Sequence, residues 1–281
     1  MPFWSRRKPE VLPANPGFRN RIVGVVRFSY PALSAFSRTP ADAAAAKAML
    51  YDPERLERRF RLFEALMLPS MLAQTDGDFQ LGFVIGDDFP KPWRDRLQDL
   101  IRPLQGAYLH PMEPAQNYKA THAAYRAARL DGASHFTTFR LDDDDAMDRD
   151  FIARLRRQAD RLSTLAGPQP WAIGHNSGFW LEIGAEGNRL YDVHERTPAC
   201  GVALVSGIKS GLTIYVQNHR DIAERFSTWL DAETPAFIRT VHRDNDASPH
   251  VAGKKGLLPP DEVRALVERH FPFTLDGLMR L

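Results

Sequence analysis

Four consecutive aspartates, Asp142 to Asp145, carry the most evident chemistry in this sequence. They follow an apolar run, residues 135–141, and precede a helical pattern that begins at Asp148. Adjacent carboxylates raise one another's pKa unless a positive charge lies among them. Closely packed carboxylate oxygens suit a hard divalent cation such as Mg²⁺ or Mn²⁺. A solvated acidic turn before a helix is the alternative, because carboxylates favour a helix N-terminus, but the preceding strand favours the cation.

Two earlier apolar runs also end in polar side chains. The first ends in Arg27 and Ser29, and the second is followed by Asp87 and Asp88. Helical patterns alternate with such runs over residues 21–165, which predicts an α/β fold with a doubly wound, mostly parallel sheet. Ligands of such sheets lie beyond the carboxyl ends of the strands. We therefore expect the three polar strand ends to meet at one site.

The first half of the chain is expected to form strands and helices in turn. The strands are predicted over residues 21–29, 79–85, 106–110 and 135–141, and the helices over 41–51, 52–74 (interrupted at Pro69), 91–101, 117–130 and 148–165. The second half reads as a smaller, antiparallel portion. Its strands are predicted over 171–183, 188–194, 198–205 and 237–242, with a short strand or turn over 214–219, helices over 220–230 and 261–270, and a mobile basic loop at 254–256.

Composition narrows the class of protein. The chain has 281 residues, of which 43% are hydrophobic, and a net charge of +2, so it can bury a large core and offers no broad charge for nucleic acid. We expect an irregular leader over residues 1–20 and one domain over 21–281. That domain divides into a nucleotide-binding half, 21–165, and an acceptor-side half, 166–281.

Cysteine use and hydropathy indicate where the protein acts. The single cysteine, Cys200, excludes an intrachain disulfide and a Cys-rich zinc site, and it favours a reducing, cytoplasmic compartment. No apolar run reaches the ~18 residues that a membrane-spanning helix needs. At most, Phe3, Trp4 and the basic residues 6–8 could contact an anionic membrane surface, although so few residues bind weakly.

The order of these features resembles the GT-A class of nucleotide-sugar-dependent glycosyltransferases. The resemblance rests on the serine-to-Gln-Thr segment, residues 70–75, and on the Asp-x-Asp pattern after the fourth strand. Residues 139–146 further resemble a bacterial family described as putative rhamnosyltransferases, and this resemblance extends over about residues 22–250. It implies an enzyme that moves a sugar, with rhamnose as the named candidate, from a UDP-, dTDP- or GDP-sugar. The implied acceptor is a glycan, a lipid-linked molecule or another hydroxyl, and the implied cofactor is Mn²⁺ or Mg²⁺.

The resemblance also assigns roles to the aspartates. It places Asp142 against the ribose or in indirect contact with the metal, and Asp144 in direct coordination. Asp143 and Asp145 then support the ligands or face the acceptor, and Asp143 is also a candidate for binding the nucleotide sugar. Because like charges repel, removing Asp144 is expected to cost little stability. His242, which ends a late apolar strand, is the candidate for an additional metal ligand, with His250 as the alternate and a plain surface histidine as the other interpretation.

Other residues are candidates for binding the donor. The expected contacts with the nucleobase, ribose or phosphates come from Arg27, Ser29, Asp87, Asp88, Lys119 and Arg140. Asp87 and Asp88 can equally well be interpreted as part of a turn. Lys119 can equally well be interpreted as a solvated lysine on a helix. For Arg140 we favour pairing with the aspartate cluster, because the five donors of a guanidinium suit clustered carboxylates.

The catalytic base and the alternatives to glycosyl transfer remain open at this point. An inverting enzyme needs a carboxylate near the acceptor hydroxyl, and Glu182 is the first candidate, ahead of Asp192 and Glu195. A metal-dependent phosphohydrolase or nuclease is the second hypothesis, for which only Asp244 and Asp246 could complete a second acidic cluster. A non-catalytic nucleotide- or carbohydrate-binding protein is the third, because a fold does not determine a function.

Overall fold

The computed structural model describes residues 15–33, 38–40, 42–245 and 254–281. Most of the expected leader, the alternate ligand His250 and the carboxylate of Asp246 lie outside these residues. Within them, no helix is long and apolar enough to cross a membrane.

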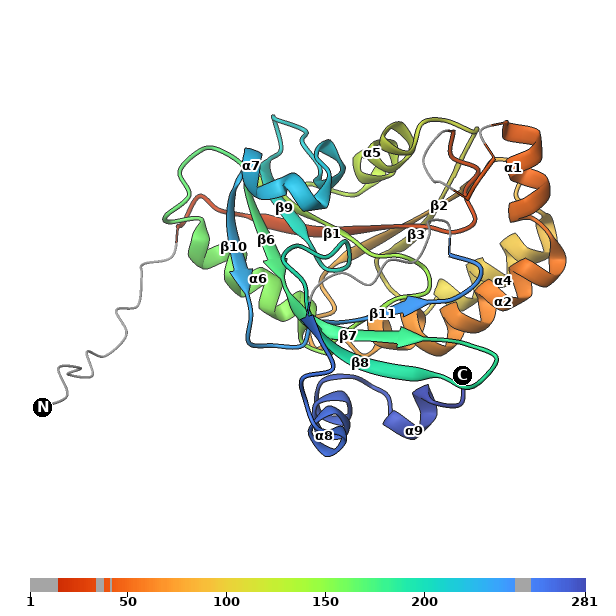
Figure 1. Cartoon of the computed structure of the whole chain (residues 1–281). Coiled ribbons are helices and arrows are strands. Elements are labelled where there is room, and N and C mark those ends of the chain that lie inside the picture. The colour runs from red at the N-terminus through yellow and green to blue at the C-terminus, as the bar shows by residue number, and fades with distance from the viewer. Residues whose placement is uncertain (1–14, 34–37, 41, 246–253) are drawn as a thin grey trace, which may run out of the picture.

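A seven-stranded sheet forms the centre of the molecule, with strand order β10-β6-β9-β4-β1-β2-β3 (Figure 1). In that order the strands are Ser227–Asp231, Trp171–His175, Ala203–Gly207, His135–Arg140, Asn20–Arg27, Gln80–Gly86 and Ala107–Met112. All neighbouring strands are parallel except at β9, which is antiparallel to both β4 and β6. The predicted α/β fold with a mostly parallel sheet is therefore confirmed.

Helices cover both faces of this sheet. In chain order, the helices of the described residues are α1 (Ala43–Leu50), α2 (Pro53–Leu62), α3 (Leu68–Leu72), α4 (Lys91–Ile101), α5 (Asn117–Ala127), α6 (Phe151–Leu162), α7 (Ile222–Arg225), α8 (Pro260–His270) and α9 (Leu275–Leu278). The last two, α8 and α9, pack against a second, smaller sheet instead. Leu56 of α2, Leu97 of α4 and Leu155 of α6 pack into one core cluster, whereas Ala124 of α5 packs into a second cluster, shared with Val23 of β1. The sheet is doubly wound, as expected.

Local sequence signals explain where helix α2 begins, and an irregular turn follows its end. The Asp52 side chain accepts a hydrogen bond from the Arg55 N–H, and Pro53 occupies the first helical position, where its missing N–H costs nothing. After α2 the chain passes through a π-helical turn, Phe63–Met67, into α3. The interruption was expected at Pro69, which lies in the first turn of α3, where its missing N–H is tolerated; the irregular turn comes before it, at Phe63–Met67.

A smaller sheet lies beside the first, with strand order β12-β8-β7-β11-β5. Its strands are Lys254–Lys255, Arg189–His194, Ser177–Glu182, Phe237–Val241 and Ala146–Met147. All its pairs are antiparallel except β7 with β11. Strand β5 directly follows the four aspartates and pairs with β11. This pairing carries the acidic segment to the end of β11, where His242 lies.

Several sequence predictions for the second half were wrong. The helix expected over 220–230 ends at Arg225, and Ser227–Asp231 forms β10 instead, because this segment gains a ladder of pairs with β6 that a local pattern does not reveal. The strand expected over 171–183 is broken at Asn176 into β6 and β7. The expected strand or turn over 214–219 contains a 3₁₀ helix, Ile214–Val216, and the expected loop at 254–256 begins with β12.

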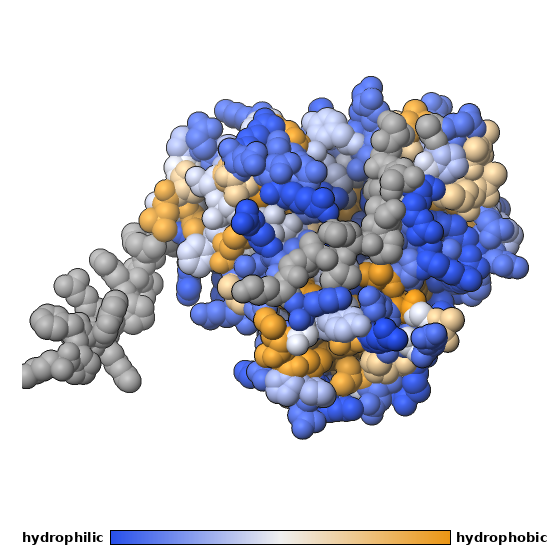
Figure 2. All heavy atoms as spheres, viewed as in Figure 1, coloured by the Kyte–Doolittle hydropathy of each residue, from blue (hydrophilic) through white to orange (hydrophobic). Residues whose placement is uncertain are grey.

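The surface is hydrophilic over most of the face in Figure 2. Hydrophobic residues gather on its lower part, over the small sheet and α8, and again where the described chain begins (Figure 2). Below the small sheet, Val263 and Val267 of α8 share a core cluster with Phe179 of β7. The smaller sheet is thus held between α8 and the body of the protein.

Candidate functional site

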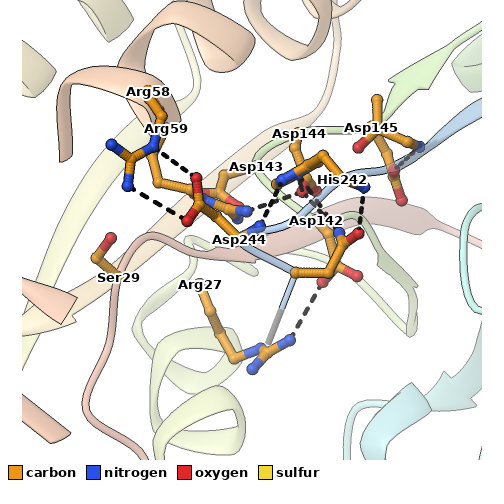
Figure 3. A network of polar contacts seen from close by, with 12 residues as sticks. Arg27, Ser29, Arg58, Arg59, Asp142, Asp143, Asp144, Asp145, His242 and Asp244 are labelled. Atoms are coloured by element: carbon orange, nitrogen blue, oxygen red, sulfur yellow. Dashed lines mark hydrogen bonds and ion pairs between the residues drawn. The ribbon is translucent and has the colours of Figure 1, made fainter. Parts of the chain in front are cut away.

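The four aspartates lie between β4 and β5 (Figure 3), and three of them are buried. Asp143, Asp144 and Asp145 are only 1%, 4% and 3% exposed, whereas the Asp142 side chain keeps 36% of its surface. A solvated acidic turn would expose all four carboxylates, so that alternative is wrong. A buried carboxylate needs a partner charge or a proton, and the identity of each partner determines what the residue can do.

Three arginines from different elements provide positive charge around this segment. Arg27 at the end of β1 donates to Asp142 at 3.2 Å. Arg59 of α2 contacts both oxygens of Asp143 and donates to Asp144 at 2.8 Å. Arg239 of β11 lies in the field of Asp145 and Asp142, which raises its pKa against the opposing effect of burial. The chain therefore supplies much of the charge that the aspartates require.

Asp144 and Asp145 have opposite protonation behaviour. Burial works to raise the pKa of Asp144, but the Arg59 charge and the hydrogen bond from His242 outweigh it and hold this pKa well below the usual range. Burial, together with the charges of Asp144 and Asp142, raises the pKa of Asp145 well above its usual value. Its carboxyl accepts a hydrogen bond from the Thr240 N–H at 2.8 Å. Asp145 thus fastens the segment to β11, and Asp144 stays ionised.

His242 directly follows β11 and reaches Asp144. Its Nε2 lies 2.7 Å from Asp144 Oδ2, across 98 residues of sequence. Asn245 holds the pair in place, since its side chain accepts from the His242 N–H at 2.7 Å and donates to Asp144 at 3.3 Å. His242 Nδ1 accepts from the Asp244 N–H at 3.2 Å, so a neutral ring carries its proton on Nε2 and donates it to Asp144.

Helix α2 links these parts through three arginines. Besides Arg59, it supplies Arg58, which forms two hydrogen bonds to Asp244, at 2.7 and 3.3 Å, and Arg55, which donates to Ser29 Oγ at 3.3 Å. Ser29 has φ 45°, a left-handed conformation that is rare for a residue with a side chain. The helix therefore connects the end of β1, the aspartates and the turn after β11 (Figure 3).

Sequence reasoning missed these arginines. It used α2 only for its buried stripe, which includes Leu56 and Phe60. The signal was present in the same pattern, because Arg55 and Arg59 are four residues apart and flank that stripe. Side chains at this spacing lie on one face of a helix, and such a face beside a buried stripe points at least partly into the protein.

We expect the Arg58–Asp244 pair to contribute about 1 kcal/mol of coupling to stability, a modest value because both side chains keep some contact with water. A double-mutant cycle with Arg58→Ala and Asp244→Ala, measured by urea unfolding, gives this coupling. Arg61→Ala, at an exposed position of the same helix, is the control and should change the free energy of unfolding by less than about 0.5 kcal/mol. Strictly additive single effects would show that the pair does not hold the turn.

A comparison with family models shows to which family this chain belongs. Residues 21–254 match the model of a family described as "Putative rhamnosyl transferase". The chain belongs to this family. The prediction of a glycosyltransferase is thereby confirmed, as is the resemblance seen in residues 139–146. No curated protein matches the sequence.

Solved structures of other transferases are similar to this rhamnosyl transferase family member at low identity. TarS 1–349 of S. aureus in complex with UDP-GlcNAc matches at 8% identity and TM-score 0.45, covering 80% of this chain and 60% of that one. The complex of TarS 1–349 with UDP matches at 10% identity and TM-score 0.43, covering 79% of this chain and 60% of that one. A protein from Desulfovibrio desulfuricans G20, described as a putative nucleotide-diphospho-sugar transferase, matches at 11% identity and TM-score 0.30, covering 81% of this chain and 82% of that one. The chain thus spans about 60% of the TarS 1–349 chain.

The donor atoms of the site offer a restricted set of metal ligands. Within the described residues, no group of three or more His, Cys, Asp or Glu side chains is arranged to hold a metal ion. Asp144 Oδ2 and His242 Nε2 meet as one carboxylate–imidazole pair. Such a pair fits a cation that completes its coordination with substrate phosphates and water. Ligation by His242 Nε2 would move the ring proton to Nδ1 and disrupt the contact with the Asp244 N–H.

The remaining predicted residues of this family member are spread around the site. Asp88 is held by Lys47 at 2.6 Å and by the Tyr51 hydroxyl at 3.2 Å, and Asp87 is exposed. Lys119 is exposed on α5. Glu182 ends β7 opposite Val241, so it lies one position from His242, and it accepts a hydrogen bond from the Tyr191 hydroxyl at 3.2 Å.

The preference for pairing Arg140 with the aspartates was wrong. Its guanidinium lies over the Tyr215 ring, 4.6 Å from the centroid, and 3.3 Å from His219 Nδ1. Alternation along β4 gives Arg140 the same face as Thr138, whose hydroxyl oxygen accepts a hydrogen bond from the Ile214 N–H at the start of the 3₁₀ helix. Arg27 and Arg59 pair with the aspartates instead.

Two further sequence features prove to be parts of the scaffold. Gln74 of the Gln-Thr segment donates to the carbonyls of Ser70 and Asp148 and accepts from the Ile152 N–H at the start of α6. Asp192, an alternative base, is buried and accepts from the backbone of Leu257 and Leu258. These side chains hold loops in place.

Proposed function

We propose that the protein transfers a sugar from a nucleotide-diphosphate donor to a hydroxyl acceptor, with Asp144 and His242 binding the donor through Mn²⁺ or Mg²⁺. The observation that supports this most is the meeting of Asp144 and His242 beyond the end of β4, beside Arg27 and Asp142. These residues belong to a chain of a glycosyltransferase family. Asp142 is the most exposed of the four aspartates and is our candidate for a ribose or metal contact.

The chemistry of the proposed transfer is charge stabilisation on the leaving diphosphate. A bound cation would stabilise the negative charge that develops on the phosphates as the glycosidic bond breaks. Arg27 lies at the same edge and can donate to a phosphate oxygen in exchange for Asp142. Arg59 holds Asp143 and Asp144 in place and keeps Asp144 ionised, so that Asp144 is ready to accept a cation or a donor hydroxyl.

The finer assignments follow the family and the geometry. We propose rhamnose as the sugar, carried on UDP, dTDP or GDP, and a glycan or lipid-linked hydroxyl as the acceptor. Glu182 is the proposed base, because it ends β7 next to the strand that carries His242. The phosphohydrolase alternative would need Asp244 as a further metal ligand, and in the structure this carboxylate pairs with Arg58. The cytoplasmic location expected from the single cysteine stays a prediction.

Calorimetric titration with UDP, dTDP and GDP, with and without Mn²⁺, tests this proposal. We expect one of the three nucleotides to bind, and to bind only when Mn²⁺ is present. His242→Ala should weaken that binding by about 10–100-fold, the usual effect of disturbing a metal site. His194→Ala, at an exposed position on β8, is the control and should leave the affinity unchanged.

The other hypotheses give different results in the same samples. If none of the nucleotides binds in a metal-dependent way, the proposed donor site is wrong. Metal-dependent binding without sugar transfer to any acceptor would indicate a binding protein. Release of nucleoside monophosphate from the nucleotide alone would indicate a phosphohydrolase.

A further inference from the structure

A second group of positive side chains gathers around His219, a residue that the proposed donor contacts do not include. Arg140, at the end of β4, donates to His219 Nδ1 at 3.3 Å. Arg220 follows in the same 3₁₀ helix, His219–Asp221, and the charge of Arg239 on β11 also acts on the imidazole. Burial and these three arginines lower the pKa of His219 to about 3. The imidazole is therefore neutral, and we call the three arginines around it the His219 cation group.

None of the three arginines forms an ion pair within the described residues. The guanidinium of Arg140 lies 4.6 Å from the centroid of the Tyr215 ring, and that of Arg239 lies 5.1 Å from the centroid of the Trp180 ring. Both arginines are half-buried. A ring face holds a guanidinium in place, and Arg140 uses one of its five N–H donors on His219, so further donors remain for an anion. Partly buried guanidinium groups with rings as neighbours indicate a negatively charged ligand.

The nearby acids do not cancel the charge of the His219 cation group. The acids beside it in the structure or the sequence are Asp142, Asp145, Glu195 and Asp221. Asp142 already accepts a hydrogen bond from Arg27 at 3.2 Å. The raised pKa of Asp145 favours its protonated, neutral form. Three guanidinium groups thus face at most two further carboxylates, and positive charge stays in excess.

The His219 cation group borders the donor site from another side. Alternation along β4 places Arg140 on the face opposite to Phe139, which packs in one core cluster with Leu56 of α2. The proposed donor contact at Asp144 belongs to the α2 side, because an arginine of that helix donates to it. Asp142 is common to both sides, since it pairs with the arginine at the end of β1 and its charge also acts on the imidazole. Two positively charged groups therefore flank one segment of aspartates.

We propose that the His219 cation group binds a phosphate or a carboxylate of the acceptor, while the nucleotide diphosphate lies at Asp144 and His242. This inference rests on the proposed function, because it assigns the second substrate of the same transfer. Guanidinium groups bind both kinds of anion through paired N–H donors. An acceptor held by this group lies beside Asp142 and thus next to the donor. The sugar acceptor is accordingly an anionic molecule.

Calorimetric titration of methyl phosphate into the full chain, saturated with Mn²⁺ and the nucleotide that binds, tests the proposal. We expect one methyl phosphate to bind per chain, with an affinity that falls as salt is raised. Arg140→Gln and Arg239→Gln should each weaken this binding by about tenfold or more, the effect of losing a charge-assisted hydrogen bond. Their effect on methyl phosphate should exceed their effect on the nucleotide.

Two further variants serve as checks. Arg220→Gln changes an exposed side chain that can be replaced without disturbing the core, and it should weaken methyl phosphate binding by about threefold, as a surface charge does. Arg126→Gln, the same substitution at an exposed position of α5, should leave the affinity for methyl phosphate unchanged. Circular dichroism melting curves show which variants are folded.

The source of the anion is decided by competition. Displacement of methyl phosphate by the nucleotide, with equal losses of both affinities in Arg140→Gln, would overturn the proposal and assign the arginines to the donor diphosphate. The absence of saturable binding, or an equal loss in Arg126→Gln, would overturn it as well. Failure of the proposed function gives a different result, because no nucleotide then binds with Mn²⁺. In that case Arg140-dependent binding of methyl phosphate to the free protein would support the anion site and remove its assignment to an acceptor.

Discussion

Arg59→Met should lower the free energy of unfolding by about 3–5 kcal/mol, the usual cost of removing one partner from a buried ion pair. The Arg59 side chain is only 6% exposed and contacts Asp143 and Asp144, which are buried as well. Methionine fills a similar volume without a charge, so two buried carboxylates would lose their main counter-charge. Urea unfolding in a buffer that contains a chelator measures the loss without help from a divalent ion.

The same variant reports on the cation. If Asp144 and His242 bind Mn²⁺, the ion should raise the melting temperature of Arg59→Met more than that of the unmodified protein, because a ligand of the folded state stabilises it by mass action. Arg61→Met, on the exposed side of the same helix, should unfold with unchanged stability and respond normally to Mn²⁺. A loss below about 1 kcal/mol for Arg59→Met, well under the expected range, would mean that the carboxylates are neutralised in another way.

The parallel half of the fold was accessible from the sequence because each element has a local signal. Strands β1, β2 and β4 are buried on both faces, so each is a continuous apolar run, and Pro53 and Asp52 mark the start of α2. The meeting of Asp144 with His242 was expected from the resemblance to a family, and the structure places their atoms 2.7 Å apart. A local sequence pattern could not predict that distance, because the two residues are 98 positions apart.

The missed features depend on partners that are distant in sequence. Arg59 lies 84 residues from Asp143, and the pattern of α2 does not say which side chains of the opposite element it meets. The segment of β10 was predicted to be helical. Its β-structure comes from pairing with β6, and a local sequence pattern does not contain that information. Repulsion among the aspartates was argued from neighbours in the chain. In the structure, burial and this repulsion raise the pKa of Asp145, whereas Arg59 and His242 outweigh burial at Asp144 and hold its pKa low.

Asp144→Asn should reduce the rate of sugar transfer by at least about 100-fold, the scale on which a single charge-stabilising group acts in catalysis. The amide has nearly the same shape as the carboxylate but lacks the charge that attracts a cation. The sequence suggested that Asp144 can be changed at little cost to stability, and its contacts in the structure lead us to expect a larger cost. Arg59, His242 and Asn245 all contact Asp144 Oδ2, so a moderate loss of about 1–3 kcal/mol is expected as well.

Asp143→Asn is the matched control, because it makes the same substitution one residue earlier in an equally buried carboxylate. Asp143 contacts Arg59 through both of its oxygens, so its loss should destabilise the protein, while the ligand pair of Asp144 and His242 is retained. We therefore expect a similar fall in melting temperature for both variants and a much larger fall in kcat for Asp144→Asn. Sugar transfer from the nucleotide sugar that binds in calorimetry, measured below both melting temperatures, gives this comparison. Equal rates in the two variants would assign the aspartates a structural role and shift the proposed cation contact to Asp142, the most exposed carboxylate of the four.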